Sequence, residues 1–291
     1  MDIIPIAGNH YPSHEAGSKC DHEAPMISRL ADVDPRAEIG PGVQIGPFCV
    51  VGPHAKIGAY TRLVNSVSLL GHVTLGTHNV LWPGCVIGGE PQDISYRQSP
   101  TQVVIGDRNI IRECVTINRG SEKEDGFTRL GSDCFLMACS HVGHDCVVGD
   151  HVIIGQGTML GGHCHVHQGA TLSGCVGVHH FGSIGQFSFV GGCSRVLQDI
   201  PPFMLADGNP ARCKCPNIVA LKRNQFPTEV ILALHEAYRL LYRGRVGTDQ
   251  ARDVLASKNH LLPEVQHLLE FLDASKSGRH GRARHAARAA A

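Results

Sequence analysis

Histidine is the residue type in this chain whose number and spacing point most directly to chemistry. The 291 residues include 19 histidines, and a dense group of them lies between His141 and His180. An imidazole titrates near neutral pH, so it can accept and return a proton during a reaction. His144, His163 and His179 follow one another at intervals of 19 and 16 residues. This near-regular spacing predicts a site for proton transfer, provided that the fold repeats at a similar interval.

Other roles for this histidine-rich stretch are weaker. The tract from His163 to His167 alternates histidine with other residues and resembles a metal site. If the tract is a strand, however, Cys164 points to the opposite side from its histidine neighbours. We therefore expect no metal here, and we interpret His151, His165 and His167 as exposed surface residues.

The element that positions these side chains is a repeat of six residues. An aliphatic residue, usually followed by glycine, recurs at every sixth position from Ile39, with a weaker extension back to Ile27. The repeat is interrupted at residues 89–104 and 122–129. The aliphatic positions are Ile39, Ile45, Val51, Ile57, Leu63, Leu69, Leu75, Leu81, Ile87, Ile105, Ile111, Ile117, Leu130, Leu136, Val142, Val148, Ile154, Leu160, Val166, Leu172, Val178, Ile184, Val190 and Val196.

A period of six fits neither an α-helix nor a simple alternating strand. It predicts short strands joined by tight corners, with three hexads forming a triangular coil of roughly 18 residues and parallel strands about 4.8 Å apart. His144, His163 and His179 would then stack along one edge of the prism. The recurrent glycine suits a corner that needs unusual dihedral angles or a close backbone approach. The two interruptions become loops that leave a rigid scaffold, which is where functional residues concentrate.

Cysteine is also common, and the repeat offers an explanation for it. Cys49, Cys85, Cys134, Cys146 and Cys164 occupy the fifth hexad position, whereas Cys114, Cys139, Cys175 and Cys193 occupy the fourth. Free cysteine behaves as a small hydrophobic residue. Packing is therefore expected to account for most of these side chains.

Composition excludes several classes of function. The net charge is zero, with 26 basic and 26 acidic residues, and does not suggest a nucleic-acid partner. No apolar run approaches the roughly 18 residues of a membrane span. Residues 1–24 lack the apolar core of a signal peptide. We therefore expect a cytoplasmic protein with reduced cysteines and no membrane insertion.

The pattern also divides the chain into segments. We expect a flexible N-terminal extension at residues 1–25, the β-helix at 26–203, a small helical domain at 204–272 and a disordered basic tail at 273–291. The helical domain is predicted from residues that share a helix face. These residues are Val230, Leu234, Ala237 and Leu241 in one helix, and Leu261, Val265 and Leu268 in another.

Several motifs resemble those of a known family. The hexapeptide pattern itself resembles that of the left-handed parallel β-helix proteins, from which the handedness is taken. The segment ACSHVGHDC at 138–146 resembles the UDP-N-acetylglucosamine O-acyltransferases that begin lipid A biosynthesis. Further matches are PQDISY at 91–96, IGDRNIIRECVTINRGS at 105–121, VGGCSRVLQDIPPF at 190–203 and NIVALKRNQF at 217–226.

The resemblance implies specific roles for residues of this chain. His144 would be the general base, with Asp145 beside it and His141 in the same site. The base would remove the proton of the sugar hydroxyl as it attacks the thioester, and a positioned base accelerates such a step roughly 10²- to 10⁴-fold. The other implied residues are the sugar-binding pair Gln92 and Asp93, the oxyanion-binding N–H of Gly162, the substrate contacts His163 and His179, the nucleotide and phosphopantetheine contacts Asn217 and Arg223, and the acyl-chain ruler Gly192.

The resemblance further implies the reaction partners. The donor would be the acyl-phosphopantetheine of acyl carrier protein, the acceptor a UDP-amino-sugar and the assembly a homotrimer, with no bound cofactor. Arg239 and Arg243 would either contact the carrier protein or form a solvated helix face. Because the donor is already a thioester, Cys139 and Cys146 are interpreted as packing residues and not as catalytic thiols.

Two departures from the family pattern concern the acceptor. Ser95 stands where the family commonly has lysine, and Asn224 where it often has arginine, so positive charge is missing near the expected diphosphate or sugar. The acceptor is therefore either UDP-N-acetylglucosamine or its 3-amino analogue. Alternatives on the same scaffold are a later UDP-glucosamine N-acyltransferase, a zinc carbonic anhydrase and a silent binding protein. Two features discriminate among these alternatives. The UDP-glucosamine N-acyltransferase usually has an additional uridine-binding domain, and the carbonic anhydrase has a pair of ligand histidines five residues apart.

Overall fold

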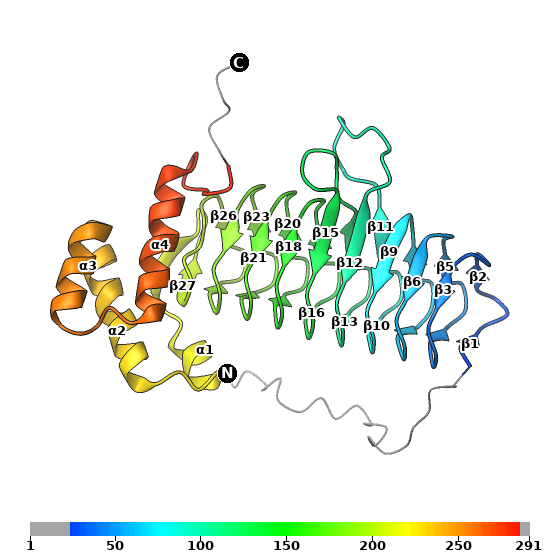
Figure 1. The fold of residues 1–291 in the computed structure, drawn as a ribbon, viewed down its shortest axis with the longest axis horizontal. Helices are drawn as coiled ribbons and strands as arrows, with labels where there is room; N and C mark the ends of the chain where they lie inside the picture. The colour runs from blue at the N-terminus through cyan, green and yellow to red at the C-terminus, as the bar shows by residue number, and fades with distance from the viewer. Residues whose placement is uncertain (1–23, 286–291) are drawn as a thin grey trace.

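The computed structural model describes residues 24–285. Of the extension expected at 1–25, residues 1–23 lie outside this range, as do residues 286–291 of the expected tail. Residues 26–216 form a left-handed parallel β-helix (Figure 1). Its three sheets form the faces of a triangular prism, and each coil contributes one short strand to each face. Strands on neighbouring coils pair in parallel at an offset of 18 residues where the coil is uninterrupted, as between His165 and Ser183. The predicted architecture is confirmed.

From β1 to β26 the strands follow the order sheet A, sheet B, sheet C, and β27 and β28 both join sheet A. Sheet A comprises β1 (Met26–Ile27), β4 (Gln44–Ile45), β7 (Arg62–Leu63), β10 (Val80–Leu81), β13 (Ile110–Ile111), β16 (Phe135–Leu136), β19 (Ile153–Ile154), β22 (Thr171–Leu172), β25 (Phe189–Val190), β27 (Met204–Asp207) and β28 (Arg212–Pro216). Sheet B comprises β2 (Asp32–Val33), β5 (Val50–Val51), β8 (Ser68–Leu69), β11 (Val86–Gly89), β14 (Thr116–Asn118), β17 (His141–Val142), β20 (Met159–Leu160), β23 (Gly177–Val178) and β26 (Arg195–Val196). Sheet C comprises β3 (Glu38–Ile39), β6 (Ala55–Ile57), β9 (His72–Leu75), β12 (Gln102–Ile105), β15 (Phe127–Leu130), β18 (Val147–Val148), β21 (His165–Val166) and β24 (Ser183–Ile184).

The interior of the prism is a column of aliphatic side chains. First-position residues such as Leu81, Val142 and Leu160 have no exposed surface. Burying one such side chain contributes about 1.5–3 kcal/mol relative to leaving it in water. Because every coil repeats this burial, a slim core with few aromatic residues is sufficient to hold the coils in register.

Glycine follows the aliphatic residue because the backbones of neighbouring coils approach closely there. A Cβ atom on Gly46 would lie 1.7 Å from the carbonyl oxygen of Val64, and one on Gly58 would lie 2.5 Å from the backbone of Gly76. Neither residue is in the left-handed region; that conformation belongs to the fourth hexad position, as in Asp145 at φ 58° and His163 at φ 63°. Close approach therefore explains the second-position glycine.

The cysteines separate according to the same geometry. Those at the fifth position are buried, but Cys114, Cys139, Cys175 and Cys193 are exposed. The prediction that packing explains most cysteines holds for the fifth position and is wrong for the fourth. The reason is the left-handed corner, where φ is 57–60° for these four residues and the side chain points out of the prism.

Both interruptions of the repeat are loops on the passage from sheet B to sheet C. The first loop, residues 90–101, follows β11, and the second loop, residues 119–126, follows β14. They project from the same edge of the prism (Figure 1) and are joined where the backbone N–H groups of Arg97 and Ser99 donate to Glu122. Two segments that are separate in sequence thus form one surface at this edge.

The C-terminal part is helical and packs on its own core. It contains α1 (Ile218–Arg223), α2 (Thr228–Tyr238), a π-helical turn η1 (Arg239–Arg243), α3 (Thr248–Ser257) and α4 (Pro263–Ser277). Leu234, Leu255 and Leu268 are fully buried in this second core. No helix in the described part of the chain is long and apolar enough to cross a membrane.

Two expected boundaries differ from the structure. Strand pairing continues beyond residue 203, because β27 pairs with β25 and β28 returns antiparallel to β27. The tail expected to be disordered from residue 273 is instead ordered as far as residue 285. Helix α4 extends to Ser277, and the backbone of Gly281 then accepts a hydrogen bond from the N–H of Asp199. Contacts with the end of the β-helix offset the cost of ordering this basic segment.

Candidate acyltransfer site

A cavity of about 460 Å³ lies on the edge of the prism between sheets B and C. Five of the residues singled out from the sequence line it, and they come from the first loop and from successive coils. These residues are Gln92, His141, His144, Gly162 and His179. Coils that are far apart in sequence but adjacent in space thus bring the expected group together.

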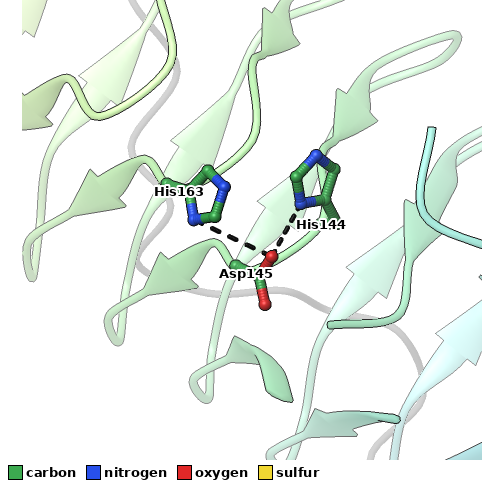
Figure 2. A group of neighbouring side chains, drawn as sticks. All are labelled: His144, Asp145 and His163. Atoms are coloured by element: carbon green, nitrogen blue, oxygen red, sulfur yellow. Dashed lines mark hydrogen bonds and ion pairs between the residues drawn. The ribbon is translucent and has the colours of Figure 1, made fainter. Parts of the chain in front are cut away.

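His144 and Asp145 form a tight pair at the corner between β17 and β18 (Figure 2). The Nδ1 atom of His144 lies 2.7 Å from Oδ2 of Asp145. Because an ionised carboxylate only accepts hydrogen bonds, Nδ1 carries a proton and donates a hydrogen bond to Asp145. The remaining ring nitrogen, Nε2, therefore keeps its lone pair in the neutral imidazole.

Asp145 is only 1% exposed and is held by donors from the second loop. Ser121 donates both its backbone N–H, at 2.7 Å, and its hydroxyl, at 2.6 Å, to the carboxylate. The backbone N–H of Asp145 in turn donates to Thr128 Oγ1. Burial opposes ionisation, but the hydrogen bonds from His144 and Ser121 outweigh it and lower the pKa of Asp145.

Gly162 lies directly against the imidazole of His144. A Cβ atom at Gly162 would be 2.6 Å from both Cε1 and Nε2 of that ring. Any side chain here would displace the imidazole, so glycine is required by the histidine that faces it. Among the residues that the structure describes, none accepts a hydrogen bond from the Gly162 N–H.

His141 and His179 flank the pair on the cavity wall. His141, in β17, shares a 2.8 Å hydrogen bond with Thr116 Oγ1 in β14. Burial, together with the nearby His144, lowers the pKa of His141. His179 packs against His180 with ring centroids 4.0 Å apart. Both residues thus reach the cavity from sheet B.

His163 lies behind the pair and does not line the cavity. Its ring meets that of His144 edge-on, with centroids 4.9 Å apart, and it stacks on Phe181 at 4.4 Å. The expectation of one continuous column of His144, His163 and His179 is therefore wrong. His144, His163 and His179 occupy the third, fourth and second hexad positions, and each position directs its side chain differently at the corner.

The loop residue Asp93 is held by groups from both loops. Its carboxylate accepts hydrogen bonds from the N–H and hydroxyl of Ser95, at 2.9 and 2.8 Å, and pairs with Lys123 of the second loop. The hydrogen bond from Lys123, followed by those from Ser95, lowers the pKa of Asp93. Asp93 does not line the cavity, although its neighbour Gln92 does.

The remaining expected site residues lie away from this cavity. Asn217 is the N-cap of α1 and is 7% exposed; its amide donates to the carbonyl of Phe187. Arg223 is exposed in the last turn of α1, and Gly192 is exposed at the corner after β25. Asn224, at the C-terminal end of α1, donates its amide to the carbonyl of Ala220. Within this single chain, none of the four lines the cavity.

The structure adds residues that sequence reasoning missed. Asn118 and Arg195 line the cavity, and Asn118 Oδ1 is buried without a partner among the described residues. Ser121 and Glu124 support the histidines from the second loop. Asn118 and Ser121 lie within the quoted segment TINRGS, so their place in that motif was the signal that could have found them. Glu124 lies outside every quoted motif and outside the six-residue repeat, so no sequence signal marks it.

His144, Asp145 and His163 also have ligand atoms within 4.8 Å of one another, a separation that suits a metal ion. Both Nδ1 atoms are instead engaged with carboxylates, His144 with Asp145 and His163 with Glu124 at 2.9 Å. Each Nδ1 atom would have to give up its hydrogen bond to a carboxylate before it could bind an ion.

Comparison with known proteins agrees with this geometry. Residues 199–280 match the family model for domain 2 of UDP-N-acetylglucosamine O-acyltransferase, and residues 36–71 and 127–162 match the bacterial transferase hexapeptide model. An acyl-[acyl-carrier-protein]–UDP-N-acetylglucosamine O-acyltransferase of Burkholderia lata is 42% identical over 208 residues, which is 70% of this chain and 79% of the relative. A protein of the same name from Synechocystis is 41% identical over 72% of this chain and 76% of its own length.

Solved structures give the same result. A UDP-N-acetylglucosamine acyltransferase from Bacteroides fragilis superposes with a TM-score of 0.82 at 34% identity, covering 85% of this chain and 97% of the other. The Francisella novicida enzyme gives 0.81 at 33% identity, over 85% of this chain and 91% of its own. On these similarities, the chain belongs to the family of acyl-[acyl-carrier-protein]–UDP-N-acetylglucosamine O-acyltransferases.

Proposed function

We propose that this chain transfers a 3-hydroxyacyl group from acyl carrier protein to the 3-hydroxyl of UDP-N-acetylglucosamine, with His144 as general base. The observation that carries the proposal is the His144–Asp145 pair on the wall of the cavity, in which Nδ1 faces the carboxylate at 2.7 Å and Nε2 is left for the substrate. Relatives named for this reaction cover most of the chain. A sugar hydroxyl is a weak nucleophile, so its proton must be removed as it attacks.

The proposed reaction is a direct transfer without an acyl-enzyme. His144 Nε2 takes the proton of the 3-hydroxyl while that oxygen attacks the thioester carbonyl carbon and forms the new C–O bond. The carbonyl electrons move onto its oxygen, where the N–H of Gly162 donates a hydrogen bond to the developing charge. The intermediate collapses by breaking the C–S bond, and the proton on His144 passes to the departing phosphopantetheine thiolate. His144 returns to its starting state.

Asp145 has two roles in this scheme. Its hydrogen bond to Nδ1 of His144 orients the ring and favours the tautomer in which Nε2 is unprotonated before the substrate binds. Once the ring carries a second proton, the neighbouring carboxylate stabilises the positive charge. The hydrogen bonds from Ser121 keep Asp145 ionised and fixed for both roles.

The cavity residues would hold the two substrates around this pair. We assign Gln92, His141 and His179 to substrate binding, because they line the same cavity as His144. Asp93 belongs to the same loop, where Lys123 holds it in place. For His163 we propose a supporting role in place of the expected substrate contact, because it lies behind the cavity wall.

Asn217 and Arg223 lead to a proposal about assembly. If they contact the nucleotide or the phosphopantetheine as the family resemblance implies, they must do so at the cavity of a neighbouring subunit. We therefore propose a cytoplasmic homotrimer, with acyl carrier protein presenting its prosthetic group at the subunit boundary. Gly192 would limit the length of the acyl chain, and Arg239 and Arg243 are candidate carrier-protein contacts.

The missing positive charges are partly replaced from elsewhere in the chain. Lys123, from the second loop, supplies a cation beside Asp93, where the family's lysine is replaced by Ser95. Arg195 supplies another on the cavity wall. Asn224 is used to cap α1. We therefore keep UDP-N-acetylglucosamine as the proposed acceptor, in preference to its 3-amino analogue.

The test is product formation from defined substrates. Purified protein is incubated with 3-hydroxyacyl carrier proteins of several chain lengths and with either acceptor, and products are identified by mass. We expect an ester on UDP-N-acetylglucosamine. Its rate of formation should fall by about 10²-fold or more in His144→Ala. The rate should be unchanged in His151→Ala, which removes an exposed histidine at another corner. Full activity of His144→Ala would refute its role as base, and product only from the 3-amino sugar would refute the acceptor.

A further inference from the structure

The segment after α4 folds back onto the β-helix in a defined conformation. Gly278 and Gly281 make the two turns possible, because a Cβ atom on Gly278 would lie 2.1 Å from the carbonyl of Arg282, and Gly281 has φ +69°. The turn is closed by backbone hydrogen bonds from Arg279 to His285 and from His285 to Arg282. We call residues 278–285 the C-terminal strap.

The strap is anchored to the last coils of the prism. The half-buried carboxylate of Asp199 accepts hydrogen bonds from the N–H of Ala283 at 2.7 Å and from the hydroxyl of Ser275 at 2.9 Å. Arg282 is only 5% exposed and donates to the carbonyl of Leu197 at 2.6 Å. A buried arginine and a half-buried carboxylate, each hydrogen-bonded to a main-chain group of the other segment, indicate a built contact and not a chance approach of a basic tail.

From this anchor, Arg284 reaches the supports of the candidate site. Its Nη1 atom donates to the carbonyl of His163 at 2.7 Å, and its Nη2 atom lies 3.0 Å from both carboxylate oxygens of Glu124. Glu124 also accepts the Nδ1–H of His163 at 2.9 Å. Arg284 thus holds both the backbone of His163 and the carboxylate that orients its ring.

The strap also completes the stack of rings behind the cavity. His285 lies parallel to Phe181 at 5.0 Å, and Phe181 lies parallel to His163 at 4.4 Å. The other side of His163 faces the reactive pair, because its ring meets that of His144 edge-on and its Nδ1 is 3.8 Å from Asp145 Oδ2 (Figure 2). His163 is therefore clamped between the strap and the pair.

The charge of Arg284 favours its position beside Glu124 and His163. The carboxylates of Glu124 and Asp145 both lie near the same ring nitrogen, Nδ1 of His163, at 2.9 and 3.8 Å, and their mutual repulsion opposes that placement. Although burial opposes ionisation of Glu124, the hydrogen bond from His163 and the charge of Arg284 lower its pKa. The guanidinium is always charged and presents a fixed fork to a carboxylate, so it neutralises Glu124 and sets its orientation. Without Arg284, His163 alone would hold Glu124.

We infer that the C-terminal strap is part of the acyltransfer machinery, and that Arg284 is a positioning residue acting through Glu124 and His163 on the His144–Asp145 pair. The inference rests on the proposed function for its kinetic consequence. The strap contacts made by Arg282, Arg284 and His285 lie beyond residue 280, where the match to the family model ends. The sequence motifs that identify the family therefore do not include them.

The kinetic test compares Arg284→Ala, Arg284→Lys and the control Arg108→Ala. Arg108 forms a comparable exposed pair with Asp133, at 2.6 Å, on another edge of the prism. We expect Arg284→Ala to lower kcat about tenfold or more with KM for both substrates within about twofold, because misplacing a catalytic group affects the chemical step. Lysine, which can reach one oxygen of Glu124, should restore part of kcat, and Arg108→Ala should match the wild type.

A second measurement does not depend on activity. In histidine-labelled protein, the Nδ1–H signal of His163, assigned by its loss in His163→Gln, should be sharp in the wild type and broadened or shifted in Arg284→Ala. Wild-type kcat, or an unchanged His163 signal, in Arg284→Ala would overturn the inference. If wild-type protein forms no acylated sugar while the signal still depends on Arg284, the proposed function fails and the positioning contact stands.

Discussion

His144 owes its place in the site to three neighbours of different kinds. Asp145 holds Nδ1, Gly162 leaves room for the ring, and His163 packs edge-on behind it. Each neighbour comes from a corner between sheets B and C, where the fourth-position residue adopts positive φ. The orientation of one imidazole thus depends on the backbone geometry of two consecutive coils.

Gly162→Ala tests this dependence at the residue scale. The added Cβ would be 2.6 Å from Nε2 of His144, so the ring must move away from its position. We expect kcat to fall by about a hundredfold, since displacements of the order of 1 Å at a catalytic group have such effects. The measurement is steady-state kinetics together with a thermal melt; unchanged kcat would show that the ring is not confined by this glycine.

At the scale of the element, the hexad sets two separate constraints. The second position requires a residue without a side chain where coils approach, and the fourth requires positive φ. Phe48, Tyr60 and His78 occupy the fourth position and have φ near 60°, although none of them is glycine. Such a conformation is costly for a single residue, but the hydrogen-bonded ladder on either side of each corner imposes it.

Gly46→Ala addresses the first constraint. Its Cβ would meet the Val64 carbonyl oxygen at 1.7 Å, and only a shift of the coil backbone can relieve that contact. We expect a loss of about 2–4 kcal/mol in the free energy of unfolding, measured by chemical denaturation. Gly177→Ala is the matched control, because nothing lies within 4 Å of its added Cβ. Equal stability of the two variants would contradict the close-approach explanation.

At the scale of the whole molecule, residues proposed for one site lie on surfaces that a single chain does not bring together. His144 lies in the cavity on the prism edge, whereas Arg223 is exposed on α1 in the C-terminal region. Among the described residues of the chain, no arginine of α1 lines that cavity. If both residues serve one reaction, a neighbouring subunit must supply one of them.

Mixed assemblies test that arrangement. His144→Ala and Arg223→Ala, each of low activity alone, are denatured together, refolded and assayed beside each variant refolded separately. We expect the mixture to recover a substantial fraction of wild-type activity, because some cavities then combine an intact His144 with an intact Arg223 from another subunit. Light scattering of the same samples gives the subunit number. If mixing gives no gain in activity, His144 and Arg223 do not act together across a subunit boundary.

The sequence alone determined the scaffold and pointed to the central pair of the candidate site. A six-residue period has few structural solutions, and an aliphatic residue at every first position leaves little freedom in what is buried. The segment ACSHVGHDC at 138–146 pointed to His144 and Asp145, which are adjacent in sequence and are therefore held by one corner. Gly162 was named by resemblance, and the contact that requires glycine there became visible only in the structure.

The tertiary structure decided every relation between distant segments. Hexad phase did not show that His163 stacks on Phe181, because neighbouring corner positions point in different directions. No sequence pattern marked Lys123 and Glu124, because their partners Asp93 and His163 lie 30 and 39 residues away in sequence. Arg284 belonged to a stretch with the composition of a disordered tail, and its contact with Glu124 spans 160 residues of sequence. Such contacts depend on the stacking of coils and the path of the chain after α4, which local sequence patterns do not encode.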